Sequence, residues 1–150
     1  MENVSLTASA IISFTEELED ESSAFYTALA ERWPENKETF QAFSKGGAKH
    51  KTWVVRTYQE TISDALEASY AFEGMSLADY AVETTLAEDA DYADALKMAL
   101  ALEEKACAFY LDVARRSESL LATIPSAFKR VAKKRGKRKP KLKSLLDAAK

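Results

Sequence analysis

Two segments of this chain each place a glutamate two helical turns before the tyrosine of a Phe-Tyr pair. They read LEDESSAFYTALAE from Leu18 and LEEKACAFYLDVAR from Leu102, and they agree at six of fourteen aligned positions, against about one by chance. On an α-helix, Glu19 shares a face with Tyr26, and Glu103 shares a face with Tyr110. A carboxylate on such an aromatic face needs a cation partner, because an unpaired buried charge is costly. The ordinary alternative is that both glutamates are solvated on amphipathic helices.

Long helices are predicted around the first segment. The chain is rich in Ala, Leu, Glu and Lys and contains only four Gly and three Pro, which is typical of an all-α protein. Apolar residues at three- and four-residue steps predict a first helix that ends at Trp33, because the residue before Pro34 is pushed out of the helical region. A second helix is predicted over residues 35–66, with a bend at the Gly46-Gly47 pair.

The second half of the chain repeats this plan. A third long helix is predicted over residues 92–117, after a short crossover helix over residues 78–86. Pro125 opens a fourth helix, which Gly136 and Pro140 should break. Two helical pairs joined by a long crossover between the second and third helices are the topology of a four-helix bundle.

With these elements in place, the sequence resembles the ferritin-like superfamily, and in particular its rubrerythrin-like branch. In that family, each helical pair carries a single Glu before an aromatic pair and, on its second helix, a Glu-x-x-His motif. The resemblance implies a bundle domain over residues 1–138, followed by a short basic C-terminal extension over residues 139–150. It also implies iron-dependent redox or storage chemistry at a di-iron centre between the helices.

Three of the six metal ligands implied by the resemblance are present. Glu19 and Glu103 match the single Glu positions, and His50 in FQAFSKGGAKH matches a motif His. The other three ligand positions fall on Gly47, Arg135 and Arg138. Two of these are permanently charged guanidinium groups, so a full di-iron centre is not expected. The resemblance also places Tyr26 and Tyr110 directly behind the two glutamates.

The sequence alone leaves two functions open for a core with these ligand substitutions. In the first, Arg135 and Arg138 pair with Glu19 and Glu103, and the bundle is a non-catalytic scaffold or interaction module. In the second, Glu19, His50 and Glu103 hold one divalent ion, either iron, manganese or zinc. The protein would then belong to iron or oxidative-stress metabolism, and any enzyme activity would be that of a di-iron-type oxidoreductase or peroxidase. The ordinary interpretation of His50 alone is a polar helix residue without a ligand role.

Charge is distributed unevenly along the chain. Eleven Lys and Arg and one acid, Asp147, lie between Lys129 and Lys150, so this segment carries +10, and the net charge of −3 leaves −13 on the rest. The run from Lys129 to Lys143 is the candidate site for a nucleic acid or another anionic partner. It has no aromatic residues for stacking on single strands, and the acidic body offers it an intramolecular partner, so a nucleic-acid role is the less favoured interpretation.

Cysteine content and the first residues indicate the compartment. Cys107 is the only cysteine, so no internal disulfide is expected, and the start MENVSLTASA lacks the basic and apolar regions of a signal peptide. No run approaches the roughly 20 apolar residues of a membrane span. A cytoplasmic homodimer without a membrane role is therefore expected.

Overall fold

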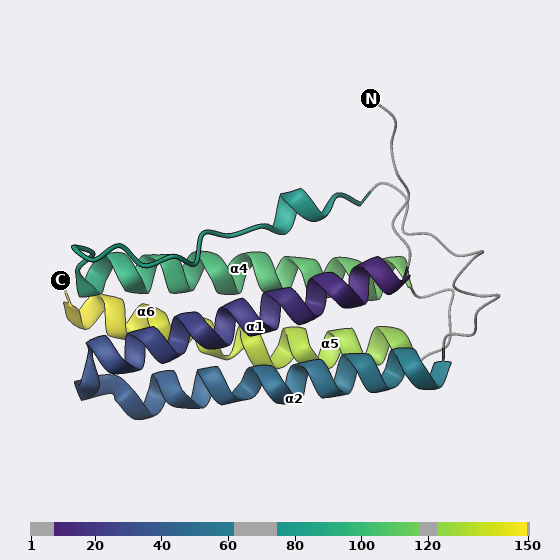
Figure 1. Cartoon of the computed structure of the whole chain (residues 1–150), viewed down its shortest axis with the longest axis horizontal. Helices are drawn as coiled ribbons and strands as arrows, with labels where there is room; N and C mark the ends of the chain where they lie inside the picture. The colour runs from purple at the N-terminus through teal and green to yellow at the C-terminus, as the bar shows by residue number, and fades with distance from the viewer. Residues whose placement is uncertain (1–7, 62–74, 118–122, 150) are drawn as a thin grey trace.

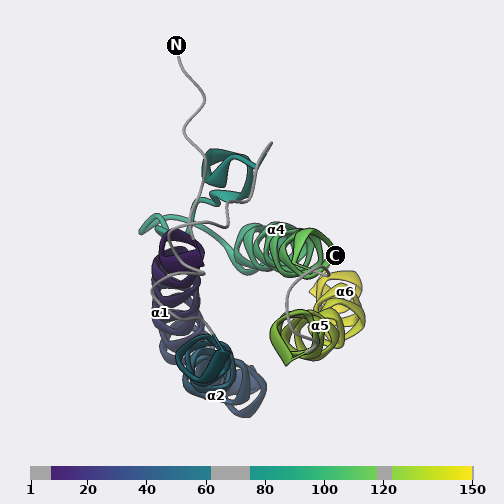
Figure 2. The same ribbon diagram turned by 90° about the vertical axis from the view of Figure 1, so that its right-hand side faces the viewer.

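The computed structural model describes residues 8–61, 75–117 and 123–149, and these residues form a helical bundle without β-strands (Figure 1). Its α-helices are α1 (Ala8–Arg32), α2 (Lys37–Thr61), α4 (Tyr92–Arg116), α5 (Thr123–Gly136) and α6 (Arg138–Ala149). Three arms of the bundle are single long helices, whereas α5 and α6 together form the fourth arm (Figure 2). The predicted all-α class is confirmed. None of the described helices has the length and apolarity that a membrane span requires.

A tight turn at Trp33 and Pro34 closes the pair formed by α1 and α2. The φ and ψ angles of Trp33 are −127° and 78°, outside the helical region, as its place before a proline requires. Pro34–Asn36 then forms a single 3-10 turn, η1, and α2 begins at Lys37. Because this turn reverses the chain, α1 and α2 lie antiparallel and side by side (Figure 1).

The Gly46-Gly47 pair, predicted as a bend, does not interrupt α2, which runs unbroken through both residues. The glycines instead lie where neighbouring groups approach the α2 backbone closely. A Cβ atom on Gly47 would lie 2.2 Å from Ser23 Oγ and 3.1 Å from the backbone oxygen of Glu19. A Cβ atom on Gly46 would lie 2.7 Å from Nη2 of Arg138. The pair thus leaves room for α1 and for Arg138, at a cost in helix propensity of roughly 1 kcal/mol per glycine.

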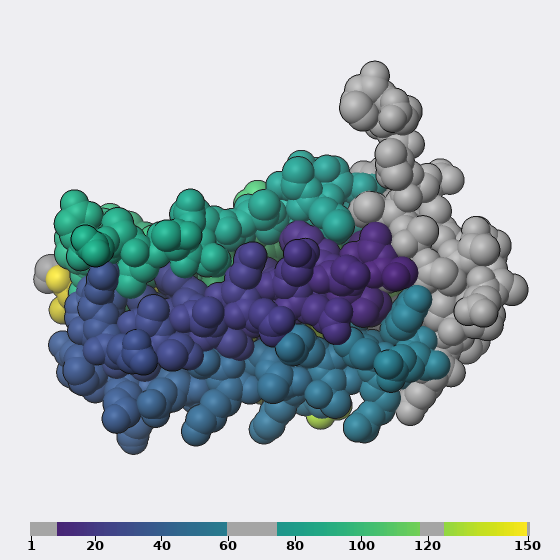
Figure 3. Space-filling model, in the orientation of Figure 1, coloured from purple at the N-terminus to yellow at the C-terminus, as the bar shows by residue number. Residues whose placement is uncertain are grey.

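The chain over residues 75–91 lies along the bundle as a mostly extended segment (Figure 3). The helix predicted over residues 78–86 is wrong, since only η2 (Leu77–Tyr80), a single 3-10 turn, is helical there. After Ala81, half-buried residues alternate with exposed ones, which is the period of an extended strand. The β-branched Val and Thr side chains of this stretch disfavour a helix, and Ser76 makes no side-chain capping hydrogen bond.

The fourth helix ends at Gly136, as predicted, and the arm resumes as α6. Lys137 alone separates α5 from α6. Pro140 does not break α6, because it lies in the first turn, where a missing N–H has no helical partner to lose. α6 packs on α4, and Leu142 is fully buried. Residues 139–149, expected as an extension, therefore lie in a packed helix of the bundle.

Aromatic rings from both halves of the chain form much of the bundle core. The Phe-Tyr pair of each repeat is buried. Phe40 of α2 stacks on Tyr26 of α1, with ring centroids 6.4 Å apart. In the other half, Phe128 of α5 lies 5.9 Å from Tyr110 of α4. This matched packing places the glutamates of the repeat inside the bundle.

Candidate functional site

Five polar side chains, each from a different α-helix, meet inside the bundle. They are Glu19 of α1, His50 of α2, Glu103 of α4, Arg135 of α5 and Arg138 of α6. The exposed fraction is 0% for Glu19, Glu103 and Arg135, 3% for His50 and 5% for Arg138. We call these five residues the central cluster. It contains the three metal ligands that the sequence predicts and both arginines that replace ligands.

Arg135 bridges the two glutamates of the repeat. Its Nε and Nη2 atoms donate to Oε2 and Oε1 of Glu19 at 3.0 and 2.9 Å. Its Nη1 atom donates to Oε1 and Oε2 of Glu103 at 2.7 and 2.8 Å. The planar guanidinium group therefore lies between the two carboxylates, in a forked geometry that a lysine ammonium group would not reproduce.

Arg138 extends the cluster from Glu103 to α2. Its Nη1 atom donates to Oε2 of Glu103 at 3.2 Å, and its Nη2 atom donates to the backbone oxygen of Phe43 at 2.9 Å. Its Cζ atom lies 4.9 Å from the ring centroid of Phe43 and 5.4 Å from that of Tyr26, so both rings contribute cation–π attraction. The predicted ion pairs between the two arginines and the two glutamates are thus present, with Arg138 paired to Glu103 alone.

The tyrosine hydroxyls cross between the two repeats. Tyr26 donates to Oε2 of Glu103 at 2.5 Å, and Tyr110 donates to Oε2 of Glu19 at 2.5 Å. Both tyrosines therefore lie against the glutamates, as expected, but each one supports the glutamate of the other repeat. This exchange is what a twofold relation between duplicated helical pairs produces.

The cluster saturates both carboxylates. Glu19 accepts two hydrogen bonds from Arg135, one from Tyr110 and one from His50, whose Nδ1 lies 3.1 Å from Oε1. Glu103 likewise accepts four, two of them from Arg135 and the others from a tyrosine and the second arginine. Because an ionised carboxylate offers about four lone-pair sites, neither glutamate has one to spare.

The charged groups of the central cluster stabilise each other's ionised forms. Burial opposes the ionisation of Glu19, but Arg135 and His50 together outweigh it and lower the pKa of Glu19 to about 2. Burial likewise opposes the charge on Arg135, yet Glu103 and Glu19 raise its pKa well above the usual range. Burial lowers the pKa of His50. At pH 7 the imidazole is therefore neutral, and its Nδ1–H donates to the ionised Glu19.

A metal ion does not fit the central cluster as it stands. The guanidinium of Arg135 fills the space between the two glutamates, and its positive charge would repel a divalent cation. Within residues 8–61, 75–117 and 123–149, no group of three or more His, Cys, Asp or Glu side chains is arranged to hold a metal. Binding one between Glu19 and Glu103 would force Arg135 out of its hydrogen bonds and leave a buried cation unpaired.

One partner of the cluster and one residue beside it were not anticipated from the sequence. The carbonyl of Phe43 has no sequence signal, because every residue carries a backbone oxygen. Ser23 does have a sequence signal. It is a serine on α1 that faces Gly47, the glycine at the lost ligand position. Its hydroxyl donates to the backbone oxygen of Ser44 at 2.7 Å, and it fills the space that a side chain on residue 47 would need.

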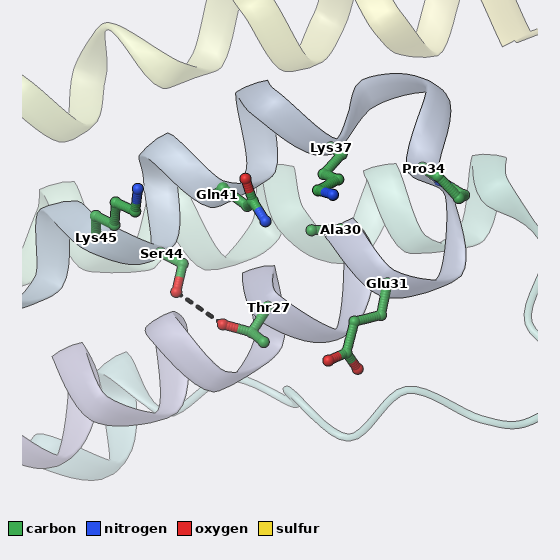
Figure 4. Close-up of a pocket in the computed structure, with 8 residues that line it drawn as sticks. All are labelled: Thr27, Ala30, Glu31, Pro34, Lys37, Gln41, Ser44 and Lys45. Carbon is green, nitrogen blue, oxygen red and sulfur yellow. Dashed lines mark hydrogen bonds between the residues drawn. The ribbon is translucent and has the colours of Figure 1, made fainter.

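An open groove of about 490 Å³ lies between α1 and α2 near the Pro34 turn (Figure 4). It is lined by Thr27, Ala30, Glu31, Pro34, Lys37, Gln41, Ser44 and Lys45. The hydroxyls of Thr27 and Ser44 lie 2.8 Å apart across it. Its lining shares no residue with the central cluster, so the candidate site is the cluster and not the groove.

Comparison with protein families, with curated proteins and with solved structures found no match to this chain. The ferritin-like resemblance therefore stays a prediction that rests on the repeat and on the positions of the cluster residues.

Proposed function

We propose that this chain is a non-catalytic helical scaffold of ferritin-like descent, in which a guanidinium group stands where the family holds its metal. The observation that carries this proposal is the bridge of Arg135 between Glu19 and Glu103. The duplicated glutamates, the crossed tyrosines and the arginines at two ligand positions support a common origin with di-iron bundles. The same proposal includes the long crossover predicted between the two helical pairs.

The role of the cluster in this proposal is to tie the helices together without a metal. Arg135 connects α5 to α1 and α4, and Arg138 connects α6 to α4 and α2. Each arginine contacts fixed acceptors, so the pairs specify the relative positions of the helices. Breaking such a buried pair by removing one partner typically costs about 3–5 kcal/mol. The ion pairs therefore fix the helices relative to each other without a metal, as a scaffold requires.

The reduced metal site, with one iron, manganese or zinc on Glu19, His50 and Glu103, is the weaker proposal. Its two carboxylates already accept as many hydrogen bonds as they have sites. A role in iron or oxidative-stress metabolism depends on that metal and has no separate support. The cytoplasmic location and the homodimer expected from the sequence also stay predictions.

Thermal unfolding with and without metal tests the scaffold proposal. We expect the same midpoint in a chelator and in excess Fe²⁺, Mn²⁺ or Zn²⁺, because Arg135 occupies the space between the two carboxylates. A metal that bound the folded chain at a hundredfold excess over Kd would add about 2.7 kcal/mol. Such a gain would raise the midpoint by about 5–10 °C for a chain of this size. A rise of that order that disappears in the Glu103→Gln variant would contradict the proposal.

A further inference from the structure

A band of exposed basic residues runs along α5 and α6. Seven of its side chains are exposed, and we call them the basic face: Lys129, Arg130, Lys133, Lys134, Lys137, Lys141 and Lys143. Within the part of the chain that the structure describes, none of them forms an ion pair. The two buried arginines of this arm are already neutralised by glutamates. The basic face is therefore a concentration of positive charge that no described acidic side chain pairs with.

The spacing of the basic face suits a linear polyanion. Lys129, Lys133, Lys137 and Lys141 follow each other at four-residue steps along the arm. A four-residue step advances about 6 Å on an α-helix, and Lys137 alone separates α5 from α6, so the four lysines span about 18 Å along the arm. Duplex DNA carries one phosphate charge per roughly 1.7 Å of its axis, so this length faces about ten phosphates.

One cation of the basic face is held in place by an aromatic ring. The Cζ atom of Arg130 lies 3.6 Å from the ring centroid of Trp53 on α2, at cation–π distance. The ring orders the guanidinium group, which reduces the entropy lost on binding a phosphate. Because the arginine covers this ring, Trp53 is not free to stack on a nucleic-acid base.

The composition of the basic face argues against other anionic partners. Single-strand binding needs open aromatic platforms, and the basic face has none. A helix that inserts in a membrane interface carries large apolar side chains beside the basic ones. Among the described residues the exposed large apolar side chain is Leu111, which lies on α4. Protein interfaces are depleted in lysine at their centres, whereas lysine is a common phosphate partner.

The acidic part of the molecule lies away from the basic face. Exposed acids gather on the segment over residues 75–91 and on α1, across the bundle from α5 (Figure 2). A helix with its side chains is about 10–12 Å across, and the Debye length is about 8 Å at physiological ionic strength. The acids are therefore largely screened from a phosphate at the basic face, although the chain carries a net charge of −3.

We propose that the basic face docks on the phosphate backbone of duplex nucleic acid without reading its sequence. This inference goes beyond the scaffold function, and it does not depend on whether the central cluster binds metal. The contact is electrostatic, so its affinity must fall steeply with salt. With about five phosphates contacted, the association constant should fall by roughly 10²–10³-fold between about 50 and 200 mM salt.

Fluorescence anisotropy with a labelled duplex of about 20 bp tests the proposal at both salt concentrations. We expect saturable binding that is equal for two unrelated sequences. The variant carrying Lys133→Glu and Lys137→Glu should bind at least about tenfold more weakly, since two contacts become repulsive. The matched control carries Lys45→Glu and Lys49→Glu, two exposed lysines at the same spacing on α2, and should bind like wild type. Circular dichroism checks that both variants are folded.

Three results would overturn the proposal. The first is no binding at the lower salt concentration. The second is equal weakening in both charge variants, which would mean a non-specific charge effect. The third is stronger binding to single strands or to anionic lipid vesicles than to the duplex. Light scattering without nucleic acid adds a check, because self-association that the Lys133→Glu and Lys137→Glu variant abolishes would assign the basic face to a second copy of the chain.

Discussion

Replacing Arg135 with methionine is expected to lower the free energy of unfolding by about 3–5 kcal/mol at pH 7. Methionine keeps the length of the side chain but removes five N–H donors. Glu19 and Glu103 then face each other inside the bundle with no charge between them. The loss should shrink as the pH falls, because protonating a carboxyl group removes the unpaired charge. Chemical denaturation followed by circular dichroism, at pH 7 and in acid, measures both effects.

Two further variants control this experiment. Lys134→Met changes the neighbouring, exposed residue of α5 and should alter the free energy of unfolding by less than about 0.5 kcal/mol. Adding Glu19→Gln to Arg135→Met removes the carboxylate left without a cation, while Glu103 keeps its pair with Arg138, and should restore a large part of the loss. If Arg135→Met were no more destabilising than Lys134→Met, the bridge would not hold the bundle together.

Acid should remove about 3 kcal/mol of stability through Glu19 alone, because the pKa of its carboxyl group falls from 4.5 to about 2 on folding. A carboxyl group whose pKa is lowered in the folded state stabilises that state above the unfolded pKa. This contribution is therefore complete above pH 4.5 and disappears as the pH falls from 4.5 to about 2. Denaturant titrations across this range measure it, and the slope should be largely absent in Glu19→Gln. Parallel losses in wild type and variant would show that Glu19 is not ion-paired.

His50 adds a smaller step at higher pH. Burial lowers its pKa from 6.5, so the unfolded chain takes up a proton before the folded chain does. Stability is therefore lost as the pH falls below 6.5, in the same direction as the effect of Glu19. The His50 step begins near pH 6.5 and the Glu19 step near pH 4.5, and a His50→Gln variant should remove the one that begins higher.

Much of the candidate site could be predicted from the repeat. An acid seven residues before a buried tyrosine has to meet a cation, and the arginines at the lost ligand positions supply that cation. Their placement requires the fourth arm to resume directly after the break that Gly136 predicts, and it does so, since α5 ends at Gly136 and α6 begins at Arg138. Burial of Arg135 and Arg138 against two carboxylates holds both of these helices in the bundle, and no local sequence pattern contains those contacts.

Sequence patterns are least informative where the contacts of distant residues decide the backbone. Gly46 and Gly47 look like helix breakers, but their lack of side chains makes room for Arg138 and Ser23, which no local window contains. The extended course after Tyr80 is fixed in a similar way, by packing along the bundle. One of its anchors is a hydrogen bond from Tyr80 to Asp112 on α4. Each of these features depends on residues more than twenty positions away.

Metal content measured on the purified protein tests the central claim most directly. The protein would be produced in cells supplied with iron, purified without chelator, and analysed for iron, manganese and zinc per chain. We expect well under one metal ion per chain, because Arg135 and its partners leave no vacant ligand between Glu19 and Glu103. Two ions per chain, lost in parallel by Glu19→Gln and Glu103→Gln variants, would contradict the account.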